Sequence, residues 1–153
     1  MNRDSRTVVR ISIIIIAIII SNLKSIDYSF IEPRYSKYIN EFVSEMENHG
    51  IDIPEQSRWT ARTEPSFFVT TTIGMARGMY DDRQVNVWFT PMLRFQKEDY
   101  IRFVVWHELA HDIFNLKHGS TLLMKSNSAP NDDELFPIAK ELFINHIKLK
   151  QKL

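Results

Sequence analysis

The hydrophobic positions along the chain predict an alternation of helices and short strands. Apolar residues spaced three or four apart predict one helix over residues 33–50 and another over residues 132–150. Two segments rich in β-branched and aromatic residues, 67–73 and 85–90, predict strands. The polar stretch over residues 51–66 predicts a loop. Helices and strands in this order favour an α+β domain with a small mixed sheet.

A further helix is expected over residues 98–115, and its pattern differs from that of the other two. It begins with acidic residues, which suit the positive end of a helix dipole, and is then apolar on nearly all sides. A helix that is apolar all round is buried rather than lying at the surface. Asn115 can adopt the left-handed conformation that ends a helix. We therefore expect this helix in the core, flanked by the N- and C-terminal helices.

The composition limits what the domain can bind. Of the 153 residues, 44% are hydrophobic and 25% are charged, which is typical of one globular domain. Lys and Arg together number 19, as do Asp and Glu, so the net charge gives no support for a nucleic-acid partner. The chain has no cysteine, so any metal must be held by His, Asp or Glu.

The N-terminus has the pattern of a targeting segment. Three arginines precede an isoleucine-rich apolar run over residues 11–20. A basic stretch followed by about ten apolar residues is typical of a secretory signal and is short for a membrane span. A cleaved signal and a retained membrane anchor both fit residues 1–25, and the alternative is a buried isoleucine strand. The arginines would keep this end in the cytoplasm and place the domain over residues 26–153 outside it.

The predicted buried helix carries the sequence His107-Glu108-Leu109-Ala110-His111. Two histidines four residues apart lie on one face of a helix, where both rings can bind one Zn²⁺. Glu108 follows the first histidine, so its carboxylate can lie beside the metal and act as general base for a water molecule. The alternative is a solvated polar stripe that matches the pattern by accident. Burial of two histidines and a glutamate would be costly without a metal or a partner, which favours the zinc site.

The third metal ligand is expected at His118, in the loop that follows this helix. Catalytic zinc sites use three protein ligands and leave one position open. Glu134 and Glu141, on or near the last helix, are the alternatives, and so is Asp112. Asp112 is poorly aimed, because adjacent helix positions point about 100° apart. His118 could also be an ordinary loop histidine.

Residues 104–124 resemble the metzincin branch of zinc peptidases. They are more similar to small bacterial and phage metalloproteases, in which the helix motif is followed by a loop histidine and a methionine turn. The chain departs from the metzincin spacing, since Phe114 occupies the glycine position and Lys117 the third-histidine position, with His118 one residue later. Met124 matches the methionine turn by its order along the chain, although it could equally be a core methionine.

The resemblance implies a zincin-like fold and a zinc peptidase activity. In zincins an edge strand before the active-site helix binds extended substrate by strand addition. By this analogy the strand with Val85, Val87 and Phe89 is the candidate substrate-binding strand, although it could be an ordinary strand of the sheet. We therefore expect a Zn²⁺ peptidase that acts on peptides or proteins. The alternatives are a catalytically silent metal-binding or envelope protein-interaction domain, and a metal-dependent amidase.

Overall fold

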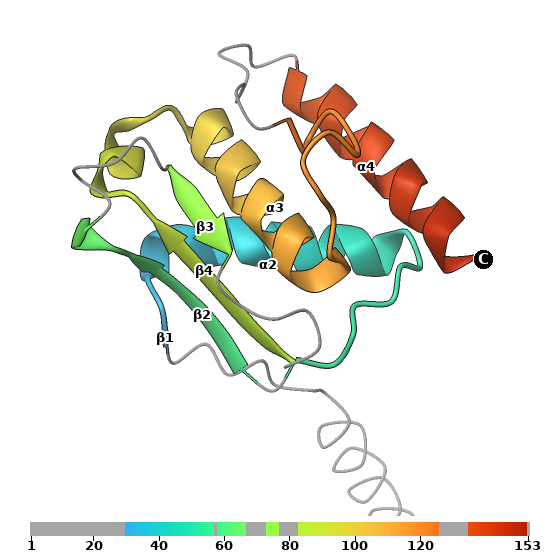
Figure 1. Ribbon diagram of the computed structural model, residues 1–153, viewed down its shortest axis with the longest axis horizontal. Coiled ribbons are helices and arrows are strands. Elements are labelled where there is room, and N and C mark those ends of the chain that lie inside the picture. The colour runs from blue at the N-terminus through green and yellow to red at the C-terminus, as the bar shows by residue number, and fades with distance from the viewer. Residues whose placement is uncertain (1–29, 57, 67–72, 77–82, 126–134, 153) are drawn as a thin grey trace, which may run out of the picture.

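The computed structural model describes residues 30–56, 58–66, 73–76, 83–125 and 135–152, which form a mixed α+β domain (Figure 1). In chain order the elements are β1 (Phe30–Ile31), α2 (Pro33–Asn48), β2 (Arg58–Thr63), β3 (Gly74–Ala76), β4 (Gln84–Phe89), the 3-10 helix η2 (Pro91–Phe95), α3 (Glu98–Phe114) and α4 (Leu135–Gln151).

The four strands form one mixed sheet in the order β1-β2-β4-β3. Strand β2 is parallel to both of its neighbours, with Thr60 opposite Phe30 in β1 and opposite Asn86 in β4. Strand β3 is antiparallel to β4 and places Met75 opposite Trp88. Among the described strands, β1 and β3 therefore form the two edges of the sheet.

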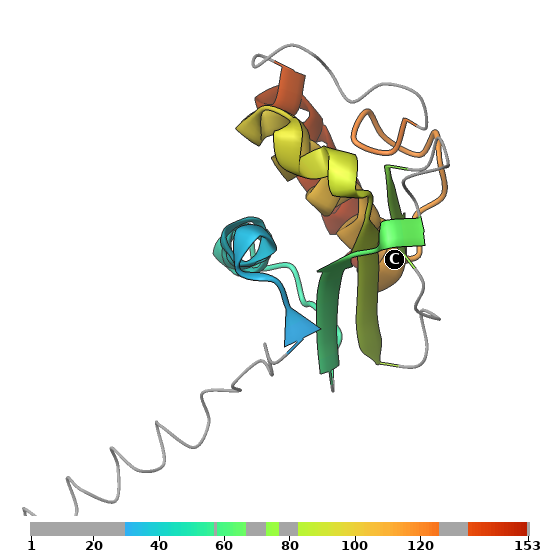
Figure 2. The same ribbon diagram turned by 90° about the vertical axis from the view of Figure 1, so that its left-hand side faces the viewer.

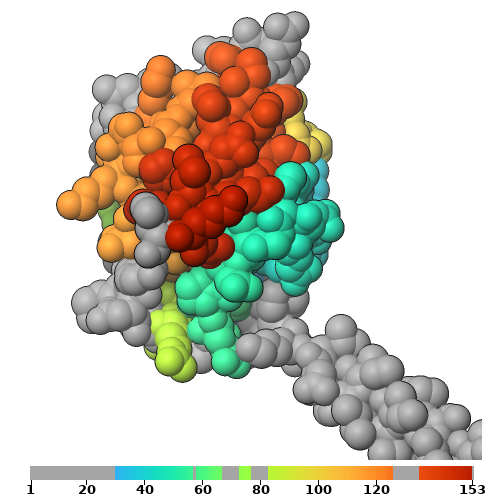
Figure 3. Space-filling model, turned by 90° about the vertical axis from the view of Figure 1, so that its right-hand side faces the viewer, coloured from blue at the N-terminus to red at the C-terminus, as the bar shows by residue number. Residues whose placement is uncertain are grey.

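Helix α3 lies at the centre of the domain. It contacts β3 and β4 on one side and both other α-helices of the described chain on the other. Helices α2 and α3 pack against the same face of the sheet, and α4 lies farther from the strands (Figures 1 and 2). In the space-filling view, α4 covers the surface between the segment after α3 and the C-terminal end of α2 (Figure 3). Trp106 of α3 joins the helices, since its ring packs edge-on against Phe42 of α2 and Phe136 of α4.

The structure confirms the predicted helices wherever it describes them. Helix α2 matches the segment expected over residues 33–50, and α4 matches the described part of the segment expected over residues 132–150. Helix α3 is buried on almost all sides, as its pattern predicts. Strand β4 matches the second predicted strand, whereas the first one, over residues 67–73, lies outside the described residues except for Ile73.

Strand β2 corrects the expectation that residues 51–66 form a loop throughout. Its sequence contains two arginines and lacks a long apolar run, yet Trp59 and Ala61 are buried against the helices. The arginines are accommodated by neighbouring rings, since Arg58 lies 4.0 Å from the ring centre of Phe30 and Arg62 lies 4.1 Å from that of Trp88. Both arginines are exposed and alternate with the buried Trp59 and Ala61, so β2 can lie between β1 and β4 without burying a charge.

The expected signal peptide or membrane anchor over residues 1–25 lies outside the described residues. Among the described helices, none combines the length and the apolar character that a membrane span requires.

Candidate metal centre

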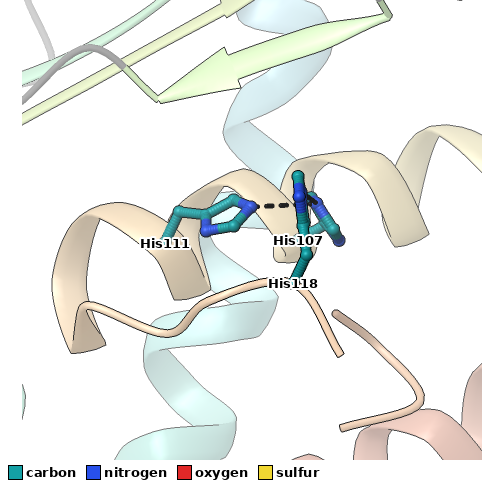
Figure 4. A group of neighbouring side chains, drawn as sticks. All are labelled: His107, His111 and His118. Atoms are coloured by element: carbon teal, nitrogen blue, oxygen red, sulfur yellow. Dashed lines mark hydrogen bonds between the residues drawn. The ribbon is translucent and has the colours of Figure 1, made fainter. Parts of the chain in front are cut away.

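Three histidine rings converge beside the C-terminal half of α3. His107 and His111 project from neighbouring turns of the helix, and His118 approaches them from the loop that follows (Figure 4). The Nε2 atoms of His111 and His118 lie 3.1 and 3.2 Å from Nε2 of His107. One nitrogen from each ring lies within 4.8 Å of the other two. The three side chains are therefore close enough to bind one metal ion.

Two of the separations between these nitrogens agree with tetrahedral coordination. Zinc–nitrogen bonds are about 2.0–2.1 Å long, so two ligands at a tetrahedral angle lie about 3.3 Å apart. The separations of 3.1 and 3.2 Å measured from Nε2 of His107 come close to that value. Three histidines are also a donor set that divalent transition metals bind well.

Backbone carbonyl groups fix the orientation of the two helical rings. Nδ1 of His107 lies 2.7 Å from the carbonyl oxygen of Leu123, and Nδ1 of His111 lies 2.6 Å from that of Leu116. A carbonyl oxygen only accepts hydrogen bonds, so each Nδ1 must be the protonated donor. In a neutral imidazole the lone pair is then on Nε2. Both helical histidines therefore direct a lone pair at the same point, as metal-binding histidines commonly do.

One loop provides both of these carbonyl groups as well as His118. Helix α3 ends because Asn115 adopts a left-handed conformation, with φ 50° and ψ 41°. This turn brings the carbonyl of Leu116 back to His111. Farther along, the backbone N–H of Gly119 donates to the carbonyl of Met124 at 2.8 Å and closes the loop beneath His118.

Burial keeps the two helical histidines neutral. It lowers the pKa of His107 to about 4, an effect that the hydrogen bond to Leu123 partly opposes. Burial also lowers the pKa of His111, and the nearby His118 lowers it further. Only the neutral imidazole has a lone pair for a metal, so these shifts favour metal binding at neutral pH.

Glu108 lies between α3 and the edge strand β3, with only 7% of its surface exposed. Burial raises its pKa to about 7, the backbone N–H of Ala76 donates a hydrogen bond that opposes this rise, and the charge of Asp112 adds to it. A carboxyl group with this pKa can take up and release a proton near neutral pH.

A pocket of about 520 Å³ opens beside the histidines and Glu108. Strand β3 forms one wall through Gly74, Met75 and Ala76, and the opposite wall includes the loop from Asn115 to His118. The pocket therefore gives a ligand access both to the three converging rings and to the carboxylate.

The alternative third ligands that the structure describes, Asp112 and Glu141, do not join this cluster. Glu141 is exposed on α4 and, among the described residues, is not part of the metal-binding group, while Glu134 lies outside them. Asp112 points towards the sheet, where its carboxylate accepts a hydrogen bond from the backbone N–H of Asn86 at 3.3 Å. Met124 is fully buried in the core near the end of the loop, and its role as a methionine turn beneath a metal stays a prediction.

The expectation that the strand with Val85, Val87 and Phe89 is an edge strand is wrong. Strand β4 lies between β2 and β3, so both of its sides are paired over Val87–Phe89. The three side chains are buried at 1% or less exposure and belong to the core. Among the described strands, the edge strand near the site is instead β3 (Gly74–Ala76).

No family model matches the chain, and the searches of curated proteins and of solved structures found no match either.

Proposed function

We propose that this protein is a zinc-dependent peptidase of zincin type. The observation that carries the proposal is the arrangement of His107 and His111, whose Nε2 lone pairs face each other at 3.1 Å while both Nδ1 atoms donate to carbonyl groups. Two lone pairs repel at this distance, and a cation between them turns the repulsion into two bonds. His118 adds the third ligand of a site with an open position.

Zinc fits this all-nitrogen donor set, and when bound it supplies a Lewis acid that polarises a carbonyl group and acidifies water. Glu108 then acts as the general base, because it borders the same pocket and its pKa of about 7 suits proton uptake near neutral pH. It can return the proton to the leaving amine of a cleaved peptide bond.

The edge strand β3 supports a peptide as the substrate. The backbone N–H of Thr90 donates to the carbonyl of Ile73, so the backbone groups of residue 73 face β4. In an antiparallel pair the next residue faces the other way, so the backbone groups of Gly74 and the carbonyl of Ala76 point outward, while the N–H of Ala76 donates to Glu108. An extended peptide that adds to this edge would pass along the pocket beside Glu108. In this proposal the strand that binds the substrate is β3 rather than β4.

The proposed setting is outside the cytoplasm, with the N-terminal segment serving as export signal or membrane anchor. Its basic residues and apolar run support this part of the proposal.

Glu108→Gln tests the peptidase activity. The full-length variant should bind one zinc ion per chain, as measured by metal analysis, yet should lose turnover of a peptide library by about 100-fold or more, because general-base catalysis contributes about that much. Glu141→Gln, an exposed change on α4, is the matched control and should keep both properties.

The outcomes separate the alternatives. A wild-type chain that binds no zinc would refute the metal centre, whereas zinc binding without turnover would favour the catalytically silent domain. Hydrolysis confined to non-peptide amides would favour the amidase.

A further inference from the structure

Gly74 lies against Glu108 more closely than any other residue type would allow. A Cβ atom at position 74 would lie 2.8 Å from Oε1, 2.9 Å from Cγ and 3.1 Å from Cδ of Glu108. Real Cβ atoms essentially never approach other heavy atoms within 3.0 Å. A glycine inside a strand commonly marks such a close approach, because it otherwise weakens the strand.

An added methyl group would force the glutamate side chain out of its place against β3, because the Cβ would meet its Cγ as well as its carboxylate. The glutamate is 7% exposed, and its backbone is fixed within the central helix α3. Its carboxylate accepts a hydrogen bond from the backbone N–H of Ala76, two residues along the same strand. Strand β3 therefore contacts the glutamate at two residues. The backbone of Gly74 packs closely against its side chain, and the N–H of Ala76 donates to its carboxylate.

We infer that Gly74 is a positioning residue for Glu108. The missing Cβ leaves the space in which the carboxylate lies flat against β3, within hydrogen-bonding reach of Ala76 and at the wall of the pocket. This inference rests on the proposed function only for its consequence in catalysis, since the contact itself exists without metal or substrate.

A double-mutant cycle in the metal-free protein tests the contact directly. In the Glu108 background, Gly74→Ala should shift the folding equilibrium towards the unfolded state by about tenfold, because overpacking a buried contact is destabilising. In the Glu108→Ala background the same change should have little effect or should stabilise, since alanine restricts the unfolded chain more than glycine does. The measurement is urea unfolding of the full-length chain with a chelator present.

Equal effects of Gly74→Ala in the two backgrounds would overturn the inference, whatever the protein's activity. If Gly74→Ala alone fails to fold, recovery of folding in the double variant with Glu108→Ala supports the contact, and failure of that variant to fold overturns it.

Turnover provides the second readout. Gly74→Ala should retain one zinc per chain and a KM within about threefold of the wild type, but its kcat should fall by about tenfold or more, because the base is displaced while the metal ligands stay in place. In the Glu108→Asp background the shorter side chain leaves room for the methyl group, so adding Gly74→Ala should lower kcat by less than threefold. An unchanged kcat in Gly74→Ala would overturn the positioning role. So would a fall in kcat on adding Gly74→Ala to Glu108→Asp that equals the fall in the wild-type background. A wild-type chain without turnover would refute the proposed function but leave the folding cycle valid.

Discussion

Replacing Glu108 with Gln should change how the stability of the metal-free protein depends on pH. Burial raises the pKa of this carboxyl group from 4.5 to about 7. Between these two values the folded state holds a proton that the unfolded chain releases. The contribution of Glu108 to stability is therefore fully present below about pH 4.5 and is lost as the pH rises through 7.

The size of this effect follows from the pKa shift. A difference of about 2.5 units between 4.5 and about 7 corresponds to about 3 kcal/mol. Because glutamine does not titrate, the stability of the wild type relative to Glu108→Gln should fall by about that amount between pH 4 and pH 8.

His107 makes the comparison sharper, because its contribution has the opposite sign. Its pKa falls from 6.5 to about 4, so the unfolded chain binds the extra proton and stability rises with pH between these values. In the wild type the contributions of His107 and Glu108 oppose each other and flatten the profile. In Glu108→Gln the rise due to His107 should emerge.

The assay is urea unfolding from pH 4 to pH 8 in the presence of a chelator. Glu98→Gln is an opposite-sign control, since its hydrogen bond with Lys37 lowers the pKa of Glu98. There the wild type should gain stability relative to the variant as the pH rises to about 4.5 and should keep that gain, unchanged, up to pH 8. Parallel stability profiles for the wild type and Glu108→Gln would refute the conclusion that Glu108 is buried as a carboxyl group with a raised pKa.

Two further predictions concern the metal ligand and the core. His118→Ala should weaken zinc binding by more than about 100-fold in a competition titration with a chromophoric chelator, because loss of a ligand's hydrogen-bond partner alone costs about 10–100-fold. Glu141→Ala should leave the zinc affinity unchanged. An unchanged affinity in His118→Ala together with a loss in Glu141→Ala would make Glu141 the third ligand. Trp106→Ala should destabilise the protein by about 3–5 kcal/mol in urea unfolding, since its ring is fully buried between α2 and α4; a loss below about 1 kcal/mol would contradict that packing.

The helix that carries the site could be predicted from the sequence because two independent patterns coincide there. Residues 98–115 are apolar on nearly all sides, and within them His107 and His111 have the spacing of metal ligands. Asn115 marks the end of the helix by its chemistry alone, and the structure places it in the left-handed conformation. The sequence predicts His118 as the third member of the cluster only with alternatives left open, and the structure places its ring beside His107 and His111.

The remaining features depend on groups that leave little trace in a sequence. The partners of the two helical histidines are the backbone carbonyls of Leu116 and Leu123, and every residue has such a carbonyl. Strand β2 differs from the prediction because only two of its residues, Trp59 and Ala61, are apolar and buried, which is too few to give a clear strand pattern. Strand β3 is only three residues long and begins with a glycine, so its sequence carries little strand signal.

The residues proposed to bind the metal and the residue proposed to transfer the proton are positioned by different parts of the fold. The loop after α3 supplies His118 together with the carbonyls of Leu116 and Leu123, so it determines both the third ligand and the tautomers of the other two. The position of Glu108 instead depends on β3, on the other side of the pocket. Changes in the loop should therefore reduce metal affinity, whereas changes at Gly74 should reduce turnover with the metal retained. This separation arises because α3 lies between the two segments and presents consecutive residues, His107 and Glu108, about 100° apart around its axis.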